Sequence, residues 1–306
     1  MKIIIFGGTG FIGSSLLELP YFQQHEVFIV TRHPEKRELP LHENFHFVKT
    51  DEQLETNLAA LFSDQYAIIN LAGESLVHWP WSKIQKQRIL LSRVHFTSLI
   101  SKLVNKADKG PEYIIQASAV GYYGFQHKNP ITEGSSAGNN FLAQVCKNWE
   151  ESLRIENHNS RVVFIRTGLV LGRDNGILEL LRLPFYLFAG GPLGPGNQMM
   201  PWIHLDDELK AIEFLMKNEQ AVGAFNLVAP EPVSMKKMMK NIGKKMNRPS
   251  WFPVPAFLLR IVLGKTFADE LVIGSQEVVP EKLLKAGYIF KYQNIEEALS
   301  DLIETK

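Results

Sequence analysis

The sequence predicts an α/β fold in which a doubly wound parallel sheet is followed by a smaller C-terminal lobe and a helical tail. Three observations support this prediction. Apolar runs rich in β-branched residues alternate with longer helix-like segments, a glycine-rich turn joins the first run to the first helix, and prolines and glycines become frequent after about residue 170. Runs that are apolar at nearly every position indicate strands covered on both faces, which is typical of a parallel sheet.

The first half of the chain supplies the elements of this sheet. Strands are predicted at 2–6, 26–30, 45–48, 66–70, 113–117 and 162–165. The segments between them are long enough to serve as the crossovers that parallel strands require. Helices are predicted at 11–19, 53–62, 82–105 and 139–157.

The second half is less regular. Residues 184–201 are rich in proline and glycine, and no element is predicted there. We expect helices at 205–216 and 234–246, a strand at 224–228, and tail helices near 256–263, 280–286 and 294–304. The predicted division is a nucleotide-binding domain with its substrate lobe, 1–170 with returning segments to about 248, and a C-terminal module, 249–306.

Composition excludes several classes of protein. The 33 Lys+Arg and 32 Asp+Glu leave no overall cationic excess for nucleic acid or anionic lipid, although a local basic patch remains open. The single cysteine, Cys146, excludes an intrachain disulfide and fits a reducing compartment. The longest uncharged stretch, 183–203, holds four glycines and four prolines and cannot cross a bilayer as a helix. We expect a soluble, cytoplasmic protein with no membrane or nucleic-acid partner.

A glycine-rich turn, GGTGFIG at 7–13, follows the first predicted strand directly and opens the first predicted helix. Gly7 permits the tight turn, Gly10 lets the backbone approach a pyrophosphate, and Gly13 lets the helix pack on the strand. This strand–turn–helix context predicts a Rossmann-type dinucleotide site; a tight turn without a ligand is the alternative.

The end of the second predicted strand indicates which dinucleotide binds. An acidic residue there would bond the ribose 2′-hydroxyl, whereas an arginine accommodates a 2′-phosphate. The strand ends in Thr31, Arg32 and His33, with no carboxylate before Glu35. This favours NADP over NAD, unless Arg32 is only a solvated loop residue.

Further motifs follow the later strands, among them NLAGE at 70–74, ASAVGYYG at 117–124, FLAQVCKNWE at 141–150, RTGLVLG at 166–172 and GGPLGPGNQMMPWIHLDD at 190–207. With them the sequence resembles the extended short-chain dehydrogenase/reductase superfamily, and more narrowly its nucleotide-sugar epimerase-like branch, over nearly the whole chain. The tail from Pro249 resembles the C-terminal module typical of that branch.

The resemblance implies roles for particular residues. Arg32 would hold the 2′-phosphate, Asp51 would lie near the adenine, and Ser118 falls at the position of the superfamily's catalytic serine. The pyrophosphate would lie on Thr9, Gly10, Phe11 and Ile12, and a ribose on Leu71, Ala72 and Gly73.

The superfamily's acid/base is a tyrosine followed four residues later by a lysine, whose ammonium lowers the phenol pKa. None of the eight tyrosines of this chain has a lysine at that spacing. Aligning FLAQVCKNWE on Glu150 puts Leu142 at the tyrosine position and Cys146 at the lysine position. Tyr122 and Tyr123 are therefore candidates for the phenol, the alternative being that they line the substrate pocket.

Three further residues are candidate substrate contacts. Arg166 follows a predicted strand and could bind a phosphate or carboxylate, or instead pair with Glu133 or Glu150. Trp202 and His204 lie in a block that lines the substrate cleft in related enzymes. His204 and Asp206 have a spacing that can reach one metal ion, but we prefer Asp206 or Asp207 as a helix N-cap and expect no metal.

The sequence does not establish the surroundings of Arg93 or the packing of an apolar group in the tail. Arg93 lies at a motif position, SRV, on an otherwise solvated helix face, and Trp251, Phe252 and Phe257 form an apolar group in the tail together with Leu258 and Leu259. We expect that group to pack on the main domain, with a homodimer contact as the alternative.

The sequence therefore predicts an NADP-binding epimerase or oxidoreductase acting on a nucleotide sugar or another small carbonyl- or hydroxyl-bearing substrate. The alternative is a non-catalytic NADP-binding regulator, because the Tyr/Lys pair is missing and members of the resembled family have also been labelled cell-division inhibitors.

Overall fold

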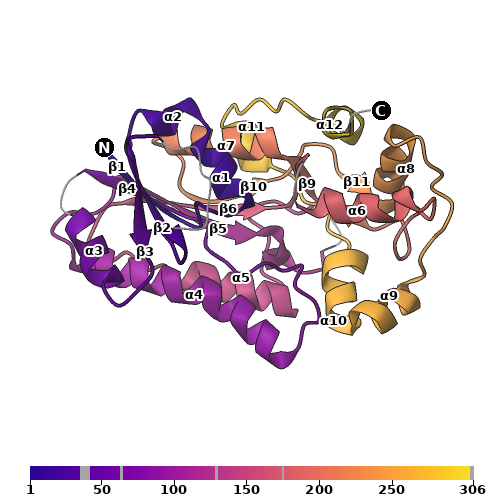
Figure 1. Ribbon diagram of the computed structural model, residues 1–306, viewed down its shortest axis with the longest axis horizontal. Coiled ribbons are helices and arrows are strands. Elements are labelled where there is room, and N and C mark those ends of the chain that lie inside the picture. The colour runs from indigo at the N-terminus through magenta and orange to yellow at the C-terminus, as the bar shows by residue number, and fades with distance from the viewer. Residues whose placement is uncertain (35–41, 63–64, 128–129, 174–175, 304–306) are drawn as a thin grey trace.

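The computed structural model describes residues 1–34, 42–62, 65–127, 130–173 and 176–303, and its elements are labelled in Figure 1. Its main sheet is all parallel, with the strand order β10-β6-β5-β4-β1-β2-β3. The strands are β1 (Lys2–Phe6), β2 (Glu26–Thr31), β3 (Phe45–Lys49), β4 (Tyr66–Asn70), β5 (Tyr113–Ala119), β6 (Arg161–Thr167) and β10 (Gly223–Leu227). The predicted fold class and strands are confirmed. Glu35 and residue 304 lie outside the described residues.

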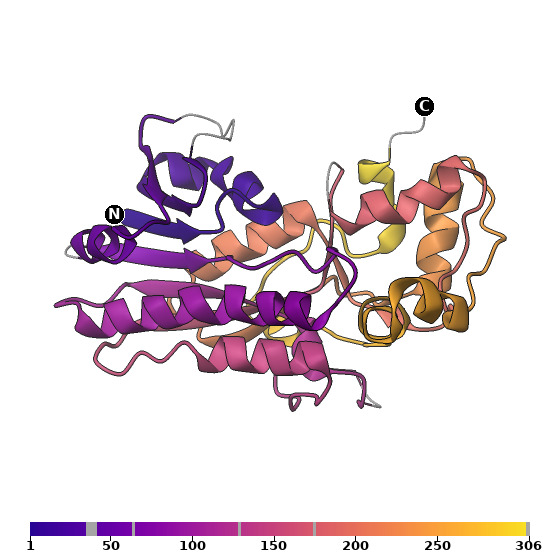
Figure 2. The ribbon, with the colours of Figure 1, turned by 60° about the horizontal axis from the view of Figure 1, so that its bottom comes forward.

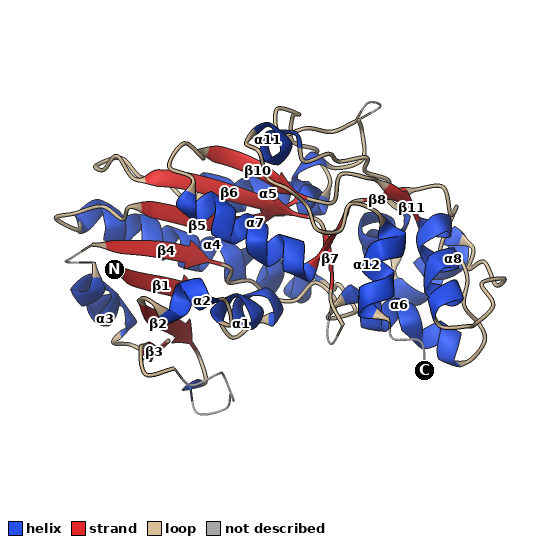
Figure 3. Cartoon of the chain, turned by 90° about the horizontal axis from the view of Figure 1, so that it is seen from above, coloured by secondary structure: helices blue, strands red, loops and turns tan. Residues whose placement is uncertain are grey.

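Helices cover both faces of this sheet, as Figure 3 shows from above. Ile3 and Ile5 point toward α1 (Phe11–Leu17), α2 (Pro20–Gln23) and α7 (Leu205–Lys217). Ile4 points the other way, toward α3 (Leu54–Leu61) and α4 (Lys83–Lys106), beside which α5 (Phe141–Glu151) lies in Figure 2. No helix in the described ranges is both long and apolar enough to cross a bilayer.

The predicted helix 139–157 is shorter in the structure, since α5 ends at Glu151. Beyond it the chain bonds to α4 instead of to itself: the Ser101 hydroxyl donates to the Arg154 carbonyl at 2.6 Å and accepts from the Arg154 N–H at 3.0 Å. A tertiary contact therefore ends this helix, which the local sequence does not reveal.

A second lobe holds α6 (Ile177–Tyr186), α8 (Met235–Lys245) and α12 (Ile295–Leu302), at the opposite end of the molecule from β3 in Figure 1. Its core includes Phe185, Met238 and Leu299. Two short strand pairs lie between lobe and sheet: β7 (Leu169–Leu171) with β9 (Trp202–His204), and β8 (Met199–Met200) with β11 (Val233–Ser234).

The expectation of no element over 184–201 is wrong at both ends. Helix α6 continues through Pro184 to Tyr186, and β8 occupies 199–200. Leu178, Leu181 and Phe185 are spaced to form one buried helical face. Their burial offsets the hydrogen bond that Pro184 cannot donate.

The tail contains α9 (Ala256–Leu263), α10 (Lys265–Phe267), the π-helix η3 (Ala268–Ile273) and α11 (Glu281–Lys285) before α12. The expected packing of its apolar group on the main domain is wrong for Trp251, Phe252 and Phe257, which are 78%, 57% and 63% exposed, whereas Leu259 is buried. The segment is attached through its main chain, because the N–H groups of Phe252 and Val254 donate to carbonyls of the 190–192 loop. A homodimer contact stays a prediction.

Candidate functional site

The glycine turn connects β1 to α1 at the carboxyl edge of the sheet, where the strand order reverses between β1 and β4. Gly7 has a φ of +76°, and a Cβ there would lie 2.8 Å from the Leu71 carbonyl carbon. A Cβ on Gly13 would lie 2.3 Å from the Gly7 oxygen. These two positions accept glycine alone, because any side chain would collide with backbone.

Helix α1 begins at Phe11 with Gly10 as its N-cap, and no side chain caps it. The first N–H groups of a helix have no acceptor within it and carry partial positive charge. A Cβ on Gly10 would meet one atom within 4 Å, the Gly7 oxygen, so space beside the helix end is open. The Phe11 ring packs against Gly172. Phe11, Ile12 and Gly13 are not among the described residues that line the cavity beside this turn, so the pyrophosphate contacts of Phe11 and Ile12 stay predictions.

A cavity of about 480 Å³ lies against this turn, and we call it the glycine-turn cavity. Its lining includes the predicted residues Gly7, Thr9, Gly10, Arg32, Leu71, Ala72 and Gly73. Thr50 lines it, but its neighbour Asp51 does not, since the Asp51 carboxylate accepts the Gln53 N–H at 3.0 Å. The adenine contact of Asp51 stays a prediction. An open backbone cradle with a cation at one end fits a phosphorylated dinucleotide.

Several polar residues of this cavity were not predicted from the sequence, among them Glu74 and His78. The His78 Nδ1 lies 3.0 Å from the Glu74 Oε1, and this bond, with the charge of Arg32, holds the Glu74 pKa below its ordinary value. The signal was the i, i+4 spacing of the two residues just after NLAG. It could not be interpreted without knowing that the loop folds back over the turn.

Arg93 separates the glycine-turn cavity from a second one. Its Nη1 donates to the carbonyls of Glu74 and Ile89 at 3.1 and 3.0 Å, and its guanidinium lies 5.0 Å from the Trp149 ring centre. A Cβ on Gly73 would lie 3.1 Å from its Cζ. Arg93 is thus a partly buried cation directly behind a lining residue of the first cavity, and it lines the second.

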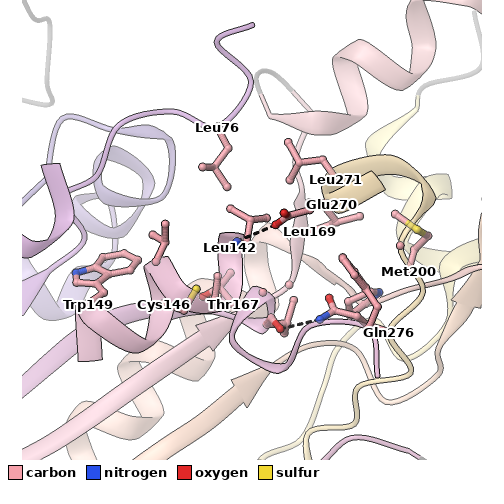
Figure 4. Close-up of a pocket in the computed structure, with 18 of the residues that line it drawn as sticks. Leu76, Leu142, Cys146, Trp149, Thr167, Leu169, Met200, Glu270, Leu271 and Gln276 are labelled. Atoms are coloured by element: carbon pink, nitrogen blue, oxygen red, sulfur yellow. Dashed lines mark hydrogen bonds between the residues drawn. The ribbon is translucent and has the colours of Figure 1, made fainter. Parts of the chain in front are cut away.

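The second cavity, of about 140 Å³, is the apolar cavity of Figure 4. Leu142 and Cys146 of α5 line it, so the positions that the resemblance gives to tyrosine and lysine do face a cavity. Burial raises the pKa of the Cys146 thiol to about 11, which keeps it neutral near pH 7. The other apolar lining residues include Leu76, Val120, Phe125, Val145, Trp149, Leu169, Met200 and Leu271.

The tail supplies one wall of the apolar cavity. The Glu270 carboxylate of η3 accepts the Phe141 and Leu142 N–H groups at 3.1 and 2.7 Å, and thereby caps α5. The Gln276 side-chain amide donates to the Val120 and Gly124 carbonyls, both at 2.9 Å. Figure 4 shows Glu270 and Gln276 opposite Cys146 and Trp149. Without the tail this cavity would lack a side.

The predicted catalytic Ser118 lies in a buried network beside the cavity and is not among its described lining residues. Its hydroxyl donates to the Glu150 Oε1 at 2.6 Å. The Arg166 guanidinium donates two hydrogen bonds to the same carboxylate, from Nε at 2.9 Å and from Nη2 at 2.8 Å. The alternative of an ion pair with Glu150 is therefore the one observed for Arg166, and its substrate role stays a prediction.

The two candidate phenols belong to this network as well. The Tyr123 hydroxyl donates to Asn226 Oδ1 at 2.6 Å and accepts from Arg166 Nη1 at 3.0 Å, and burial raises its pKa to about 12. The Arg166 guanidinium lies 3.5 Å from the Tyr122 ring centre. Neither tyrosine is among the described lining residues of the apolar cavity, and their catalytic role stays a prediction.

Trp202 and His204, in β9, are not among the described lining residues of either cavity. The Trp202 indole donates to the Glu231 carbonyl at 3.1 Å. His204, and neither Asp206 nor Asp207, is the N-cap of α7: its Nδ1 accepts the Asp206 N–H at 3.0 Å. The helix begins at Leu205 as predicted, and its cap lies two residues before Asp206 because β9 continues to His204. The substrate roles of Trp202 and His204 stay predictions.

Comparison with known proteins gives matches along the whole chain. The NAD dependent epimerase/dehydratase family matches residues 3–227, and a domain of unknown function, DUF1731, matches residues 254–302. The chain is 35% identical to "Epimerase family protein SDR39U1 homolog, chloroplastic" of Arabidopsis thaliana, over 99% of this chain and 87% of that protein. It is 36% identical to "Epimerase family protein YfhF" of Bacillus subtilis, over 99% and 98%.

Solved structures match as well. Human epimerase family protein SDR39U1, crystallised with NADPH, superposes with a TM-score of 0.87 at 29% identity, over 99% of both chains. UDP-glucose 4-epimerase of Thermotoga maritima, crystallised with UDP-glucose, superposes with a TM-score of 0.77 at 17% identity, over 99% of this chain and 97% of that one, a likeness of fold.

Proposed function

Because the chain belongs to the NAD-dependent epimerase/dehydratase family, we propose that it binds NADPH in the glycine-turn cavity and acts as an oxidoreductase or epimerase on a small substrate in the apolar cavity. The observation that carries this proposal is the adjacency of the two cavities: Arg93 lines one and lies directly behind Gly73 of the other. When bound, the dinucleotide supplies or accepts the hydride.

The chain's own residues favour NADP over NAD. Arg32 lines the glycine-turn cavity where an acidic residue would select the unphosphorylated ribose. The related human protein was crystallised with NADPH. The partly buried Arg93 guanidinium adds a second positive charge beside Gly73, where it would stabilise the dinucleotide and hold its ribose end in place.

The apolar cavity favours a small, largely apolar carbonyl compound over a nucleotide sugar. A nucleotide sugar brings a pyrophosphate, which requires cations or a cluster of N–H donors. Among the described lining residues Arg93 is the cation, and Glu270 places a carboxylate on the opposite wall. Arg166, expected to meet a phosphate, is bound to Glu150.

The experiment is a turnover assay of purified protein with NADPH against small aromatic and aliphatic aldehydes and ketones, and separately against UDP-sugars. We expect NADPH oxidation with members of the first group and none with the second. Turnover of UDP-sugars alone would contradict the proposed substrate class. Absence of turnover with both groups would contradict the proposal that the protein is an enzyme.

A second candidate, a non-catalytic NADPH-dependent regulator, is favoured by one observation: the Ser118 hydroxyl is committed to Glu150 and lies outside the described cavity lining. The two candidates separate on the wild-type protein. An enzyme oxidises NADPH with a member of the substrate panel, whereas a regulator shows no turnover while NADPH still raises its melting temperature.

A further inference from the structure

Glu208 is a buried acid for which the fold gives no structural reason. It lies in the first turn of α7 and is 0% exposed. Its Oε1 accepts the Thr167 hydroxyl at 2.8 Å, while its Oε2 has no hydrogen-bond partner among the described residues. Burying a carboxyl group with one oxygen unpaired is costly, so a residue of this type at this place calls for an explanation.

Its one partner faces the apolar cavity. Thr167 ends β6 and lines that cavity, and among the described lining residues it alone carries a hydroxyl group. A hydroxyl can donate one hydrogen bond while it accepts another. When Glu208 is protonated at Oε1 it donates to Thr167 Oγ1, and the threonine hydrogen is then free to point into the cavity.

The surroundings of Glu208 favour its protonated, neutral form. Burial raises its pKa to about 8, against a smaller opposing effect of the Thr167 hydrogen bond. Helix α7 packs against α1, β5, β6, β7 and β9, and of these α1 and β7 carry no titratable side chain. The titratable residue of β9, His204, is the N-cap of α7 and accepts the Asp206 N–H. Tyr288, whose hydroxyl is bonded to Asp207, interacts with Glu208 electrostatically. The titratable residues of β5 and β6 do not pair with Glu208. Tyr113 and Arg161 lie at the first residues of these strands, and Arg166 donates to the Glu150 carboxylate.

We propose that Thr167 and Glu208 form a proton relay for the apolar cavity, with Thr167 as the catalytic residue that touches the substrate oxygen and Glu208 as the positioning residue behind it. This inference rests on the proposed function and supplies the acid/base that Leu142 and Cys146 cannot provide.

The protons balance in either direction. In carbonyl reduction, with NADPH as the reductant, the Thr167 O–H bond breaks as the substrate O–H bond forms. The Glu208 O–H bond breaks as the threonine hydroxyl is restored. The resulting carboxylate regains a proton from solvent through Thr167 after product leaves, and alcohol oxidation runs the same steps backward.

The test compares Thr167→Val, which removes the hydroxyl at nearly constant shape, with Thr167→Ser, which keeps it, on the aldehyde or ketone that the wild type turns over best. We expect Thr167→Val to lower kcat by about 100-fold or more with little change in KM, and Thr167→Ser to stay within about tenfold of the wild type. Glu208→Gln should lower kcat and remove the inflection near pH 8 from its pH profile. Wild-type kcat in Thr167→Val would overturn the relay.

A second measurement does not depend on turnover. Infrared spectra of the protein saturated with NADP⁺ should show a protonated carboxyl band that disappears as pH rises through about 8, shifts in Thr167→Val, and is absent in Glu208→Gln. A Glu208 already ionised at pH 6 would overturn the relay and leave the proposed function standing. Absence of turnover across the whole panel, with the band as expected, would overturn the proposed function and with it the catalytic use of the pair.

Discussion

The two cavities of this protein are built in different ways. The glycine-turn cavity is formed mainly by the ends of β1, β2 and β4 and by the loops that directly follow them, with Thr50 after β3 and Ser92 and Phe96 of α4. The apolar cavity combines β6, α5 and the 119–125 segment with tail residues that lie more than a hundred positions further along the chain. The first is a local property of strand–loop junctions, and the second exists only after the tail has docked.

Their electrostatics differ as well. The glycine-turn cavity contains Arg32, His78 and Glu74 at its rim together with an uncapped helix end, which suits an anionic dinucleotide. In the apolar cavity both charged lining residues are engaged, Arg93 by carbonyls and Glu270 by the start of α5. Charge recognition and substrate shape are therefore assigned to separate parts of the chain, and single substitutions can test that separation.

The largest expected effect concerns the buried acid behind the apolar cavity. Because the Glu208 pKa is about 8 in the folded protein and 4.5 in the unfolded chain, its contribution to the free energy of unfolding is fully present below about pH 4.5 and is lost as pH rises to about 8. Each pKa unit corresponds to about 1.4 kcal/mol. Urea unfolding between pH 5 and 8 should show a fall in wild-type stability that Glu208→Gln largely removes.

The matched control is Glu219→Gln, at an exposed position further along the same segment, which should keep the wild-type slope. An identical slope in the wild type and Glu208→Gln would mean that the acid is not held in its neutral form.

The next effect concerns the glycine turn. Gly13→Ala places a Cβ where the Gly7 carbonyl oxygen lies, so the turn must shift. Overpacking of this kind costs about 1–3 kcal/mol, and we expect NADPH affinity to fall by about 5- to 150-fold, measured by fluorescence titration. Gly134→Ala, at a glycine with open space around it, should leave NADPH affinity unchanged. Unchanged affinity in Gly13→Ala would show that the turn does not hold the dinucleotide.

Cofactor choice gives a smaller effect. Arg32→Ala removes the exposed cation of the glycine-turn cavity, and the loss of a charge-assisted bond of about 1.5 kcal/mol should weaken NADPH about tenfold while NADH binding stays constant. Calorimetric titration with both dinucleotides measures this, with Arg88→Ala on the exposed face of α4 as the control. An equal loss for NADPH and NADH would refute recognition of the 2′-phosphate.

The smallest effect tests the tail. Glu270→Ala leaves the start of α5 without its cap, and we expect a loss of about 1 kcal/mol in the free energy of unfolding with NADPH affinity unchanged. Glu281→Ala removes an exposed pair with Lys285 and should cost less than half of that. A parallel loss of NADPH affinity in Glu270→Ala would show that the two cavities are not independent.

Much of the fold could be predicted because its signals are short in range. The strands β1 and β4 and the helix α9 begin and end where the sequence predicts, since apolar runs and flanking turn residues define them locally. Helix α6 was missed because the burial of Phe185 in the second lobe outweighs the local effect of Pro184.

Less of the candidate site could be predicted. The residues of the glycine turn follow from spacing alone. The commitment of Ser118 to Glu150, the cap that Glu270 places on α5, and the pairing of Thr167 with Glu208 join residues 32, about 130 and 41 positions apart. Helical and strand periodicity relate only residues a few positions apart, so they do not predict contacts at these separations in the sequence.

The parallel sheet, the dinucleotide turn, the cation at Arg32 and the absence of a Tyr/Lys pair follow from the amino-acid sequence, because each depends on neighbouring residues and on the chemistry of their side chains. Which polar groups are free to act depends instead on the tertiary structure. Hydrogen bonding and burial depend on what the fold brings together, and here they engage the predicted Ser118 and Arg166 while placing Thr167 at the cavity with a buried acid behind it.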